Sequence, residues 1–241
     1  MSQEERIFIP PLGADYIFPN PRFASKEGLL AYGGDLSPNR LLMAYRKGIF
    51  PWYSQGDPIL WWSPDPRLLL EPKSFKVSKS FRKILKKSAF EVQFDRRFRE
   101  VLFACANTPR KNQHGTWLLP AMQEAYANLH EMGFAHSVEV LQDGVLVGGL
   151  YGVAIGKGFF GESMFSHVSN GSKIALKALS DVLAHRGYDF IDCQLKTEYL
   201  VSLGAFEVSR DIFLDRLQDT LAKPTDLGLW QHFSWEYKDD R

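Results

Sequence analysis

The chain has 241 residues, of which 45% are hydrophobic and 24% charged, and its formal net charge is +1. This composition is that of a globular protein with one large domain, or a main domain and a smaller partner. With so little net charge, a polyanionic partner would have to meet a local basic patch. The two cysteines, Cys105 and Cys193, have no CxxC or Cys/His surroundings, which argues against a zinc site.

The N-terminus is acidic and lacks the apolar core of a signal peptide. No apolar run approaches the ~18 residues that a transmembrane helix needs. We therefore expect a cytoplasmic protein that neither enters nor spans a membrane.

Residues 7–66 hold nine of the thirteen prolines and a dense aromatic set. So many prolines interrupt regular elements. They predict a small, loop-rich N-terminal lobe, residues 1–66, with one helix over 38–47 that Ser37 caps and Gly48 ends. The tryptophans of this lobe either fix it to the main domain, residues 67–241, or line a pocket. The sequence leaves both possibilities open.

A basic segment follows, in which residues 73–90 contain no acidic side chain. Its cations are Lys73, Lys76, Lys79, Arg82, Lys83, Lys86 and Lys87. Phe81, Ile84 and Leu85 recur at helical spacing and predict an amphipathic helix over about 79–87, with Ser78 as its cap. A charged face is usually only solvated, but one without acids indicates an anionic partner, with phosphate backbone ahead of a membrane surface. No aromatic residue lies on the basic face, which favours backbone contact over base reading.

The remaining chain predicts a mixture of helices and strands. The expected strands are 90–94, 137–141, 145–155, 159–165, 188–194 and 206–209, and the expected helices 96–106, 117–132, 169–185, 198–203 and 212–221. Asp95 is the expected cap of the first of these helices, Asp143-Gly144 a two-residue hairpin turn, and the aromatic tail 230–237 is expected to pack back. This order predicts an α+β protein with one mixed, largely antiparallel sheet. It is also the order of the GNAT acyltransferase fold, a likeness of fold that carries no function by itself.

The sequence supports neither of two cofactor-binding motifs. Residues 156–161 match GxGxxG, but a strand-like segment follows instead of a helix, so we do not expect a dinucleotide site. An acetyl-coenzyme A enzyme of this fold would carry a Gln/Arg-x-x-Gly-x-Gly/Ala loop before the helix 169–185, and residues 166–172 do not match it. Simple acetyl transfer is weakened and stays an alternative.

Two acids stand in otherwise apolar runs. Glu162 lies within the apolar and glycine-rich stretch 148–165, and Asp192 closes the run 188–191. A carboxylate among apolar groups is costly unless it is hydrogen-bonded or lines a polar cleft. One such acid could equally lie on the wet face of an edge strand, but two near strand ends favour a shared cleft.

Seven stretches rich in tryptophan, proline and glycine carry a resemblance to a known family. They are residues 33–37, 48–52, 57–67, 115–117, 161–166, 191–194 and 202–205. On these residues the chain resembles the leucyl/phenylalanyl-tRNA–protein transferases. Leu150 and Leu179 stand where that family has a methionine and an aromatic residue, so the shape of the pocket departs from the family pattern while its apolar character is kept.

The resemblance implies an aminoacyltransferase. It would move leucine or phenylalanine, and methionine less readily, from an aminoacyl-tRNA to the α-amine of a protein that begins with arginine or lysine, which marks that protein for degradation. It also implies a small N-terminal lobe joined to a GNAT-like domain that works without metal or coenzyme. The basic segment 73–87 would meet the tRNA phosphates.

The same resemblance suggests how the site residues divide the work. The apolar candidates for the pocket of the donated side chain are Leu150, Phe159, Met164, Leu176, Leu179 and Ile191, with Ser166 as a further substrate-binding candidate. Such a pocket would reject β-branched side chains by shape. Trp52 and Trp117 would stack on the terminal adenosine.

Transfer needs a free α-amine, whose ordinary pKa is about 7.7–8.0, so we expect a base or relay. The hypothesis is that Asp192, through Gln194, positions the amine and accepts its proton. Gln194 would also hold the oxyanion, and Glu162 would orient the ribose or the acceptor. The alternative is that the ribose 2′-hydroxyl carries the proton. A coenzyme A-dependent N-acetyltransferase and a tRNA-binding protein without turnover remain the rival functions.

Overall fold

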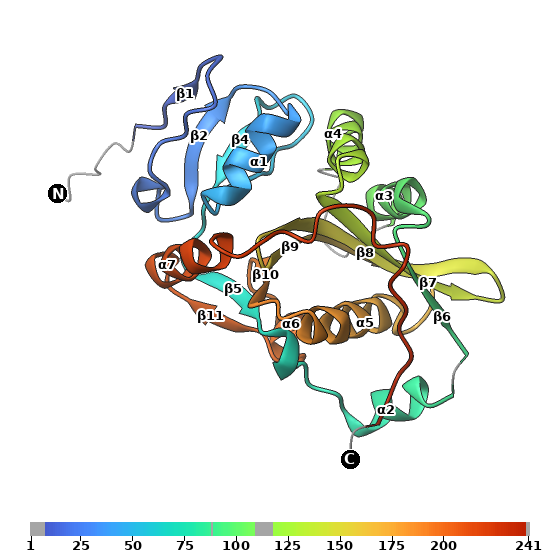
Figure 1. Ribbon diagram of the computed structural model, residues 1–241. Coiled ribbons are helices and arrows are strands. Elements are labelled where there is room, and N and C mark those ends of the chain that lie inside the picture. Colours follow the sequence, from blue (N-terminus) through green and yellow to red (C-terminus); the bar gives the residue numbers. More distant parts are fainter. Residues whose placement is uncertain (1–7, 88, 109–117, 240–241) are drawn as a thin grey trace.

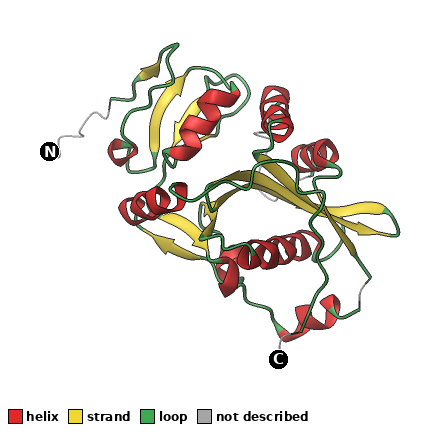
Figure 2. Cartoon of the chain, in the orientation of Figure 1, coloured by secondary structure: helices red, strands yellow, loops and turns green. Residues whose placement is uncertain are grey.

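The computed structural model describes residues 8–87, 89–108 and 118–239. Its main body is a seven-stranded sheet in the order β11-β5-β10-β9-β8-β7-β6, and a four-stranded sheet in the order β1-β2-β4-β3 forms the N-terminal lobe. Figure 1 shows this lobe in blue and cyan above one end of the main body, and Figure 2 shows the same arrangement by element type.

The N-terminal lobe is more regular than the prolines suggest. It contains β1 (Pro11–Leu12), a 3-10 turn η1 (Pro21–Phe23), β2 (Leu29–Gly33), α1 (Pro38–Arg46), β3 (Phe50–Pro51) and β4 (Leu60–Trp62). The helix is confirmed, but the small sheet was not expected, because its strands have only two to five residues. Prolines lie at the ends of β1 and β3, where strands tolerate them. Ser37 occupies the N-cap position without making a side-chain cap bond.

The main body follows the predicted order from residue 79 onward, whereas strand β5 was not predicted. Its elements are β5 (Arg67–Leu70), η2 (Pro72–Ser74), α2 (Lys79–Leu85), β6 (Glu91–Phe94), α3 (Phe98–Asn107), α4 (Pro120–Glu131), β7 (Ala135–Gln142), β8 (Val145–Ile155), β9 (Gly158–Ser166), α5 (Gly171–His185), β10 (Phe190–Gln194), α6 (Glu198–Ser202), β11 (Phe206–Val208) and α7 (Arg210–Leu221). Neighbouring strands are antiparallel except β9 and β10, which run parallel. The α+β class with a mixed sheet is confirmed.

Both faces of the large sheet are covered. Helices α3 and α4 lie on one face and α5 on the other (Figure 1). Along β8, Tyr151 and Val153 join the apolar cluster that includes α3 and α4, whereas Leu150 and Ala154 join the cluster that includes α5. A strand buried on both faces reads as one apolar run instead of an alternating one, which is why residues 145–155 look so uniform.

The predicted cap at Asp95 is wrong. Helix α3 begins after Arg97, and Asp95 instead accepts hydrogen bonds from the backbone amides of Ser137 at 2.8 Å and Trp230 at 2.7 Å. Trp230 is 1% exposed and stacks on Phe233. The aromatic tail therefore packs back as expected, and a buried carboxylate fastens it.

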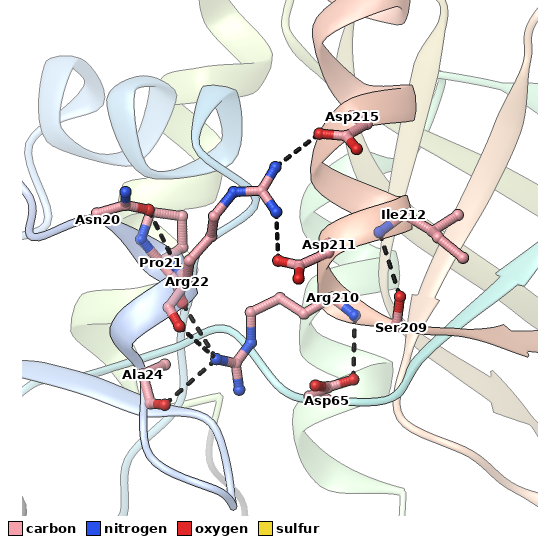
Figure 3. A network of polar contacts seen from close by, with 10 residues as sticks. All are labelled: Asn20, Pro21, Arg22, Ala24, Asp65, Ser209, Arg210, Asp211, Ile212 and Asp215. Carbon is pink, nitrogen blue, oxygen red and sulfur yellow. Dashed lines mark hydrogen bonds and ion pairs between the residues drawn. The ribbon is translucent and has the colours of Figure 1, made fainter.

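The junction between the lobe and the main body is a polar latch (Figure 3). The buried guanidinium of Arg210, at the start of α7, donates to the carbonyl oxygens of Pro21, Arg22, Ala24 and Ser25 at 3.0–3.4 Å. Arg22 reaches back to Asp211 and Asp215 on the same helix. Because one cation satisfies four backbone acceptors, the lobe is held in one orientation.

The apolar core runs through the same junction. Trp61 is fully buried and donates from Nε1 to the carbonyl of Gly33 at 2.9 Å. It belongs to the same cluster as Phe160 and Phe190 of the large sheet. The lobe and the main body thus share one apolar core that contains Trp61, which agrees with the first of the two alternatives considered for the tryptophans.

We predict that Arg210→Met lowers the free energy of unfolding by about 2–4 kcal/mol, because it leaves buried carbonyls without donors. Chemical denaturation followed by tryptophan fluorescence measures this. Arg22→Gln is the matched control, since its ion pairs are exposed and exposed pairs contribute little. An Arg210 variant no less stable than the control contradicts the latch.

Candidate active site

A cavity of about 420 Å³ opens where β9 and β10 separate. The two parallel strands are paired only as far as Phe160 and Asp192. Beyond that point the cavity is lined by residues 161–164 of β9 and by residues 193–195, which follow Asp192. Residues of α5 and α6 complete its lining. A gap between diverging parallel strands is a place where a ligand can reach backbone and side chains of both.

The apolar wall contains all six predicted pocket residues. These are Leu150, Phe159, Met164, Leu176, Leu179 and Ile191. They come from four elements, β8, β9, α5 and β10, and five of them are at most 4% exposed. The structure therefore brings them together in one wall, and their binding of a donated side chain stays a prediction.

Glu162 reaches the mouth of this cavity through a β-bulge. Tyr151 pairs with Ser163 and Gly152 pairs with Gly161, so Glu162 has no residue opposite it on β8. Such a bulge redirects a side chain and is frequent beside functional sites. A Cβ atom at Gly152 would lie 2.2 Å from the carbonyl oxygen of Phe160, so only glycine fits opposite the bulge.

The Glu162 carboxyl is held on both oxygens. Tyr126 donates from its hydroxyl to Oε2 at 2.7 Å, and Gln194 donates from Nε2 to Oε1 at 2.9 Å. The Tyr45 hydroxyl lies 2.7 Å from that of Tyr126. Burial raises the pKa of Glu162 to about 7 although these hydrogen bonds lower it. The group is thus poised to gain or lose a proton near neutral pH.

The two tyrosines keep their protons throughout this range. Both rings are buried, and burial together with the charge of Glu162 raises the pKa of Tyr45 and of Tyr126 well above its ordinary value. They act as permanent donors that orient the carboxyl. Neither was found in the sequence, because a tyrosine at helical spacing among apolar residues reads as core.

Asp192 lies beneath the site instead of in it. Its carboxylate is fully buried and forms a two-pronged ion pair with Arg67, at 2.9 Å to Nε and 2.6 Å to Nη2. Oδ1 also accepts the backbone N–H of Gln194 at 2.9 Å. Gln194 has φ 62°, an uncommon left-handed conformation, and this bond helps to hold it there.

This geometry revises the expected relay through Asp192. The side chain of Gln194 bonds to Glu162, and Asp192 receives only the backbone N–H of Gln194. Asp192 does not line the cavity. An amine in the cavity therefore meets Glu162 before any other carboxylate of the described residues. Arg67 was not predicted as a site residue. The one signal for it in the sequence is a charged residue at the start of the apolar run 68–70.

Two other predicted substrate residues, Trp52 and Ser166, are not among the residues that line the cavity. Trp52 is 38% exposed and packs edge-on against Trp62, in the N-terminal lobe. Ser166 accepts from the backbone N–H of Ser172 at 2.6 Å, so it caps the start of α5. Trp117 lies outside the described residues. Their roles in binding the adenosine or the donor stay predictions.

The basic helix forms as predicted, with Ser78 accepting from the N–H of Phe81 at 3.2 Å. Part of its positive charge is neutralised, because Arg82 and Lys86 form ion pairs with Asp239 of the tail at 3.4 and 2.6 Å. Within the described chain, Lys73, Lys76, Lys79, Lys83 and Lys87 keep no such partner. No group of three or more His, Cys, Asp or Glu side chains in the described ranges could hold a metal ion.

Two family models match the chain. Residues 69–218 match "Leucyl/phenylalanyl-tRNA protein transferase" and residues 34–65 match the N-terminal domain of the same family. The relative from Desulfatibacillum aliphaticivorans is 55% identical over 213 residues, covering 88% of this chain and 91% of that protein. The relatives from Nitrosospira multiformis and Syntrophus aciditrophicus are 56% and 53% identical over 213 and 222 residues, covering 88% and 92% of this chain and 91% and 93% of those proteins.

All three relatives carry the name leucyl/phenylalanyl-tRNA–protein transferase. A solved structure of L-PGS from Bacillus licheniformis is similar at a TM-score of only 0.36 and 11% identity, over 66% of this chain and 51% of that one. That likeness decides nothing. The family matches, in contrast, identify an enzyme of the aminoacyl-transferring class. The chain belongs to the leucyl/phenylalanyl-tRNA–protein transferase family.

We predict that the contribution of Glu162 to stability falls as the pH rises from about 4.5 to about 7, whereas that of His136, whose pKa burial lowers, changes in the opposite direction. In the folded chain Glu162 keeps its proton up to about pH 7, whereas its ordinary pKa is 4.5. The native state then binds more protons than the unfolded state between these values, and its free energy of unfolding decreases with pH. Glu139, whose pKa burial also raises to about 7, contributes in the same direction.

Glu162→Gln should remove the contribution of Glu162, so that the denaturation midpoint falls less, or rises more, with pH than in the wild type. The control is Glu124→Gln, because Arg99 lowers the pKa of Glu124 and that group is already ionised throughout the interval. A slope equal in Glu162→Gln and wild type would contradict the raised pKa.

Proposed function

We propose that this enzyme transfers leucine or phenylalanine, and methionine less readily, from aminoacyl-tRNA to the α-amine of proteins that begin with arginine or lysine, and so marks them for degradation. The observation that carries the proposal is the cavity itself. An apolar wall, suited to a long unbranched side chain, ends at a single hydrogen-bonded carboxyl at its mouth.

The donor and the acceptor would meet at that mouth. The donated side chain enters the apolar wall, and its ester points toward Glu162 and Gln194. The amide of Gln194 is a donor for the developing oxyanion. The acceptor brings two positive groups, its α-amine and its arginine or lysine side chain, and a carboxylate at the mouth favours both.

We assign proton acceptance to Glu162 and a supporting role to Asp192. A base acts best when its pKa lies near the working pH, and burial raises the pKa of Glu162 to about 7. Asp192 instead holds Arg67 and the backbone of Gln194. Because an ester is already activated, one such base is enough on the protein side.

The unpaired cations of the basic helix would contact the tRNA backbone, which suits an enzyme that accepts several tRNAs. Trp52 and Trp117 would stack on the terminal adenosine. The division into a lobe of residues 1–66 and a GNAT-like domain of residues 67–241 belongs to the same proposal. A cytoplasmic location is also part of this proposal. Among the described helices, none is long and apolar enough to cross a membrane.

Transfer of labelled leucine or phenylalanine from several charged tRNAs to a peptide beginning with arginine tests the function directly. We predict transfer to this peptide and none to one beginning with glutamate, because the carboxyl at the mouth disfavours a second acid. Saturable binding of acetyl-coenzyme A without aminoacyl transfer would favour the acetyltransferase. Binding of tRNA without turnover would favour a plain RNA-binding protein.

The assignment of the base makes a separate prediction. Glu162→Gln should lower kcat by about 100-fold, the range of general-base catalysis, with little change in KM for the aminoacyl-tRNA. Because Glu162 accepts a proton only when ionised, the wild-type rate should rise through about pH 7. The variant should lose this limb and keep only the rise set by the acceptor amine, whose ordinary pKa is about 7.7–8.0.

Glu124→Gln, an exposed carboxyl substitution, serves as control for this experiment. The alternative of a substrate-carried proton is tested with aminoacyl-tRNA ending in 2′-deoxyadenosine. Full kcat in Glu162→Gln, together with loss of transfer from the 2′-deoxy donor, would assign the proton to the ribose instead.

A further inference from the structure

A second cavity lies between the end of α6, the first turn of α5 and the segment that leads into α2. It has a volume of about 270 Å³, and its polar lining is Lys76, Ser78, Lys173 and Ser202, over a floor of Phe81 and Leu203. We call it the Lys173 cavity. It shares no lining residue with the donor cavity. Of its residues only Lys76 has been given a role, as one of the cations of the basic segment.

Lys173 is half-buried and unneutralised. Its Nζ lies 5.3 Å from the ring centre of Phe81 and 5.6 Å from that of Tyr199. One turn further along α5, Lys177 has an ion pair with Asp181, but no carboxylate of the described residues pairs with Lys173. Two aromatic faces thus hold the ammonium in place without cancelling its charge.

The position of Lys173 on its helix adds to this charge. It stands in the first turn of the 15-residue helix α5, which has no acid there. The N-terminal end of a helix carries partial positive charge, so a lysine in the first turn is unfavourable by itself. Together with Lys76, also unpaired in the described chain, it makes a site of positive potential that lacks an anion.

The walls of the cavity are firmly joined. The backbone N–H of Lys76 donates to the carbonyl of Leu203 at 2.8 Å. Beside this bond, a Cβ atom at Gly204 would lie 2.5 Å from the carbonyl oxygen of Ser74. The segment that carries Lys76 and Ser78 is therefore pressed against the end of α6. The Ser202 hydroxyl already donates to the carbonyl of Tyr199 at 2.6 Å, and Ser78 caps α2. The two ammonium groups are therefore what suits this hollow to one phosphate group.

Tyr199 relates this cavity to the donor site. Its ring lines the donor cavity and contacts Lys173. We propose that the Lys173 cavity binds a backbone phosphate of the single-stranded 3′ end of the tRNA, next to the aminoacylated adenosine. This inference rests on the proposed function. The phosphate contact in this cavity, close to the ester, is distinct from the contacts that the basic helix would make further along the tRNA.

The test compares two stable donor analogues by calorimetry. One is the trinucleotide CCA carrying phenylalanine through an amide, and the other is the same amide of adenosine without any phosphate. Lys173→Gln should weaken binding of the trinucleotide by about tenfold, the value of one charged contact. It should leave the affinity for the nucleoside unchanged. In this variant, the slope of log affinity for the trinucleotide against log salt concentration should fall in magnitude by roughly 0.7, as for the loss of one phosphate contact to a single strand.

Lys173→Arg keeps the charge and should restore most of the affinity. Lys26→Gln, an exposed lysine of the N-terminal lobe, should change neither ligand. Lys83→Gln on α2 should weaken whole tRNA but not the trinucleotide. Unchanged trinucleotide affinity in Lys173→Gln overturns the proposal. An equal loss for the nucleoside also overturns it, because the substitution would then act through the donor cavity.

Transfer by the wild-type enzyme separates this idea from the function on which it rests. If the wild type transfers leucine or phenylalanine and Lys173→Gln binds the trinucleotide normally, the phosphate site alone is wrong. If the wild type neither transfers nor binds either analogue, both proposals are wrong.

Discussion

The buried ion pair between Arg67 and Asp192 is the contact on which the site depends. Arg67 starts β5, and its guanidinium also donates to the carbonyl of Gly48 at 3.2 Å and lies against the rings of Phe50 and Phe213. One side chain therefore joins the lobe, α7 and the central strands. Removing either charge would leave the other buried alone, which is among the costlier changes a core can suffer. The position of Gln194, and through it that of Glu162, follows from this pair.

The sequence predicted the class of fold and the apolar half of the site well. The helices and strands of the main body have strong periodicity or plain turn signals, such as Asp143-Gly144, and these are local properties. The six pocket residues were found because the family resemblance pointed to apolar positions, and strands β8, β9 and β10 together with helix α5 bring them to one wall.

The polar half could not be read in the same way. The bulge that turns Glu162 outward depends on a register shift against β8, and no residue pattern within β9 announces it. Arg67 and Asp192 are 125 positions apart, as remote as Asp95 is from the tail that it fastens. In the lobe, proline suppressed every strand signal, although short strands with prolines at their ends form there. Such features are set by long-range pairing, which a local pattern does not contain.

The tail has a consequence for how the enzyme is made. Trp230 lies 6.0 Å from Phe159, ring centre to ring centre, and Phe159 belongs to the apolar wall of the donor cavity. During synthesis the strands of that wall leave the ribosome long before residue 230 does. Domains fold largely as units once their chain is available, so the donor cavity gains its final support only after residue 230 has left the ribosome. A prematurely terminated chain would carry most of the active-site residues around a poorly supported wall.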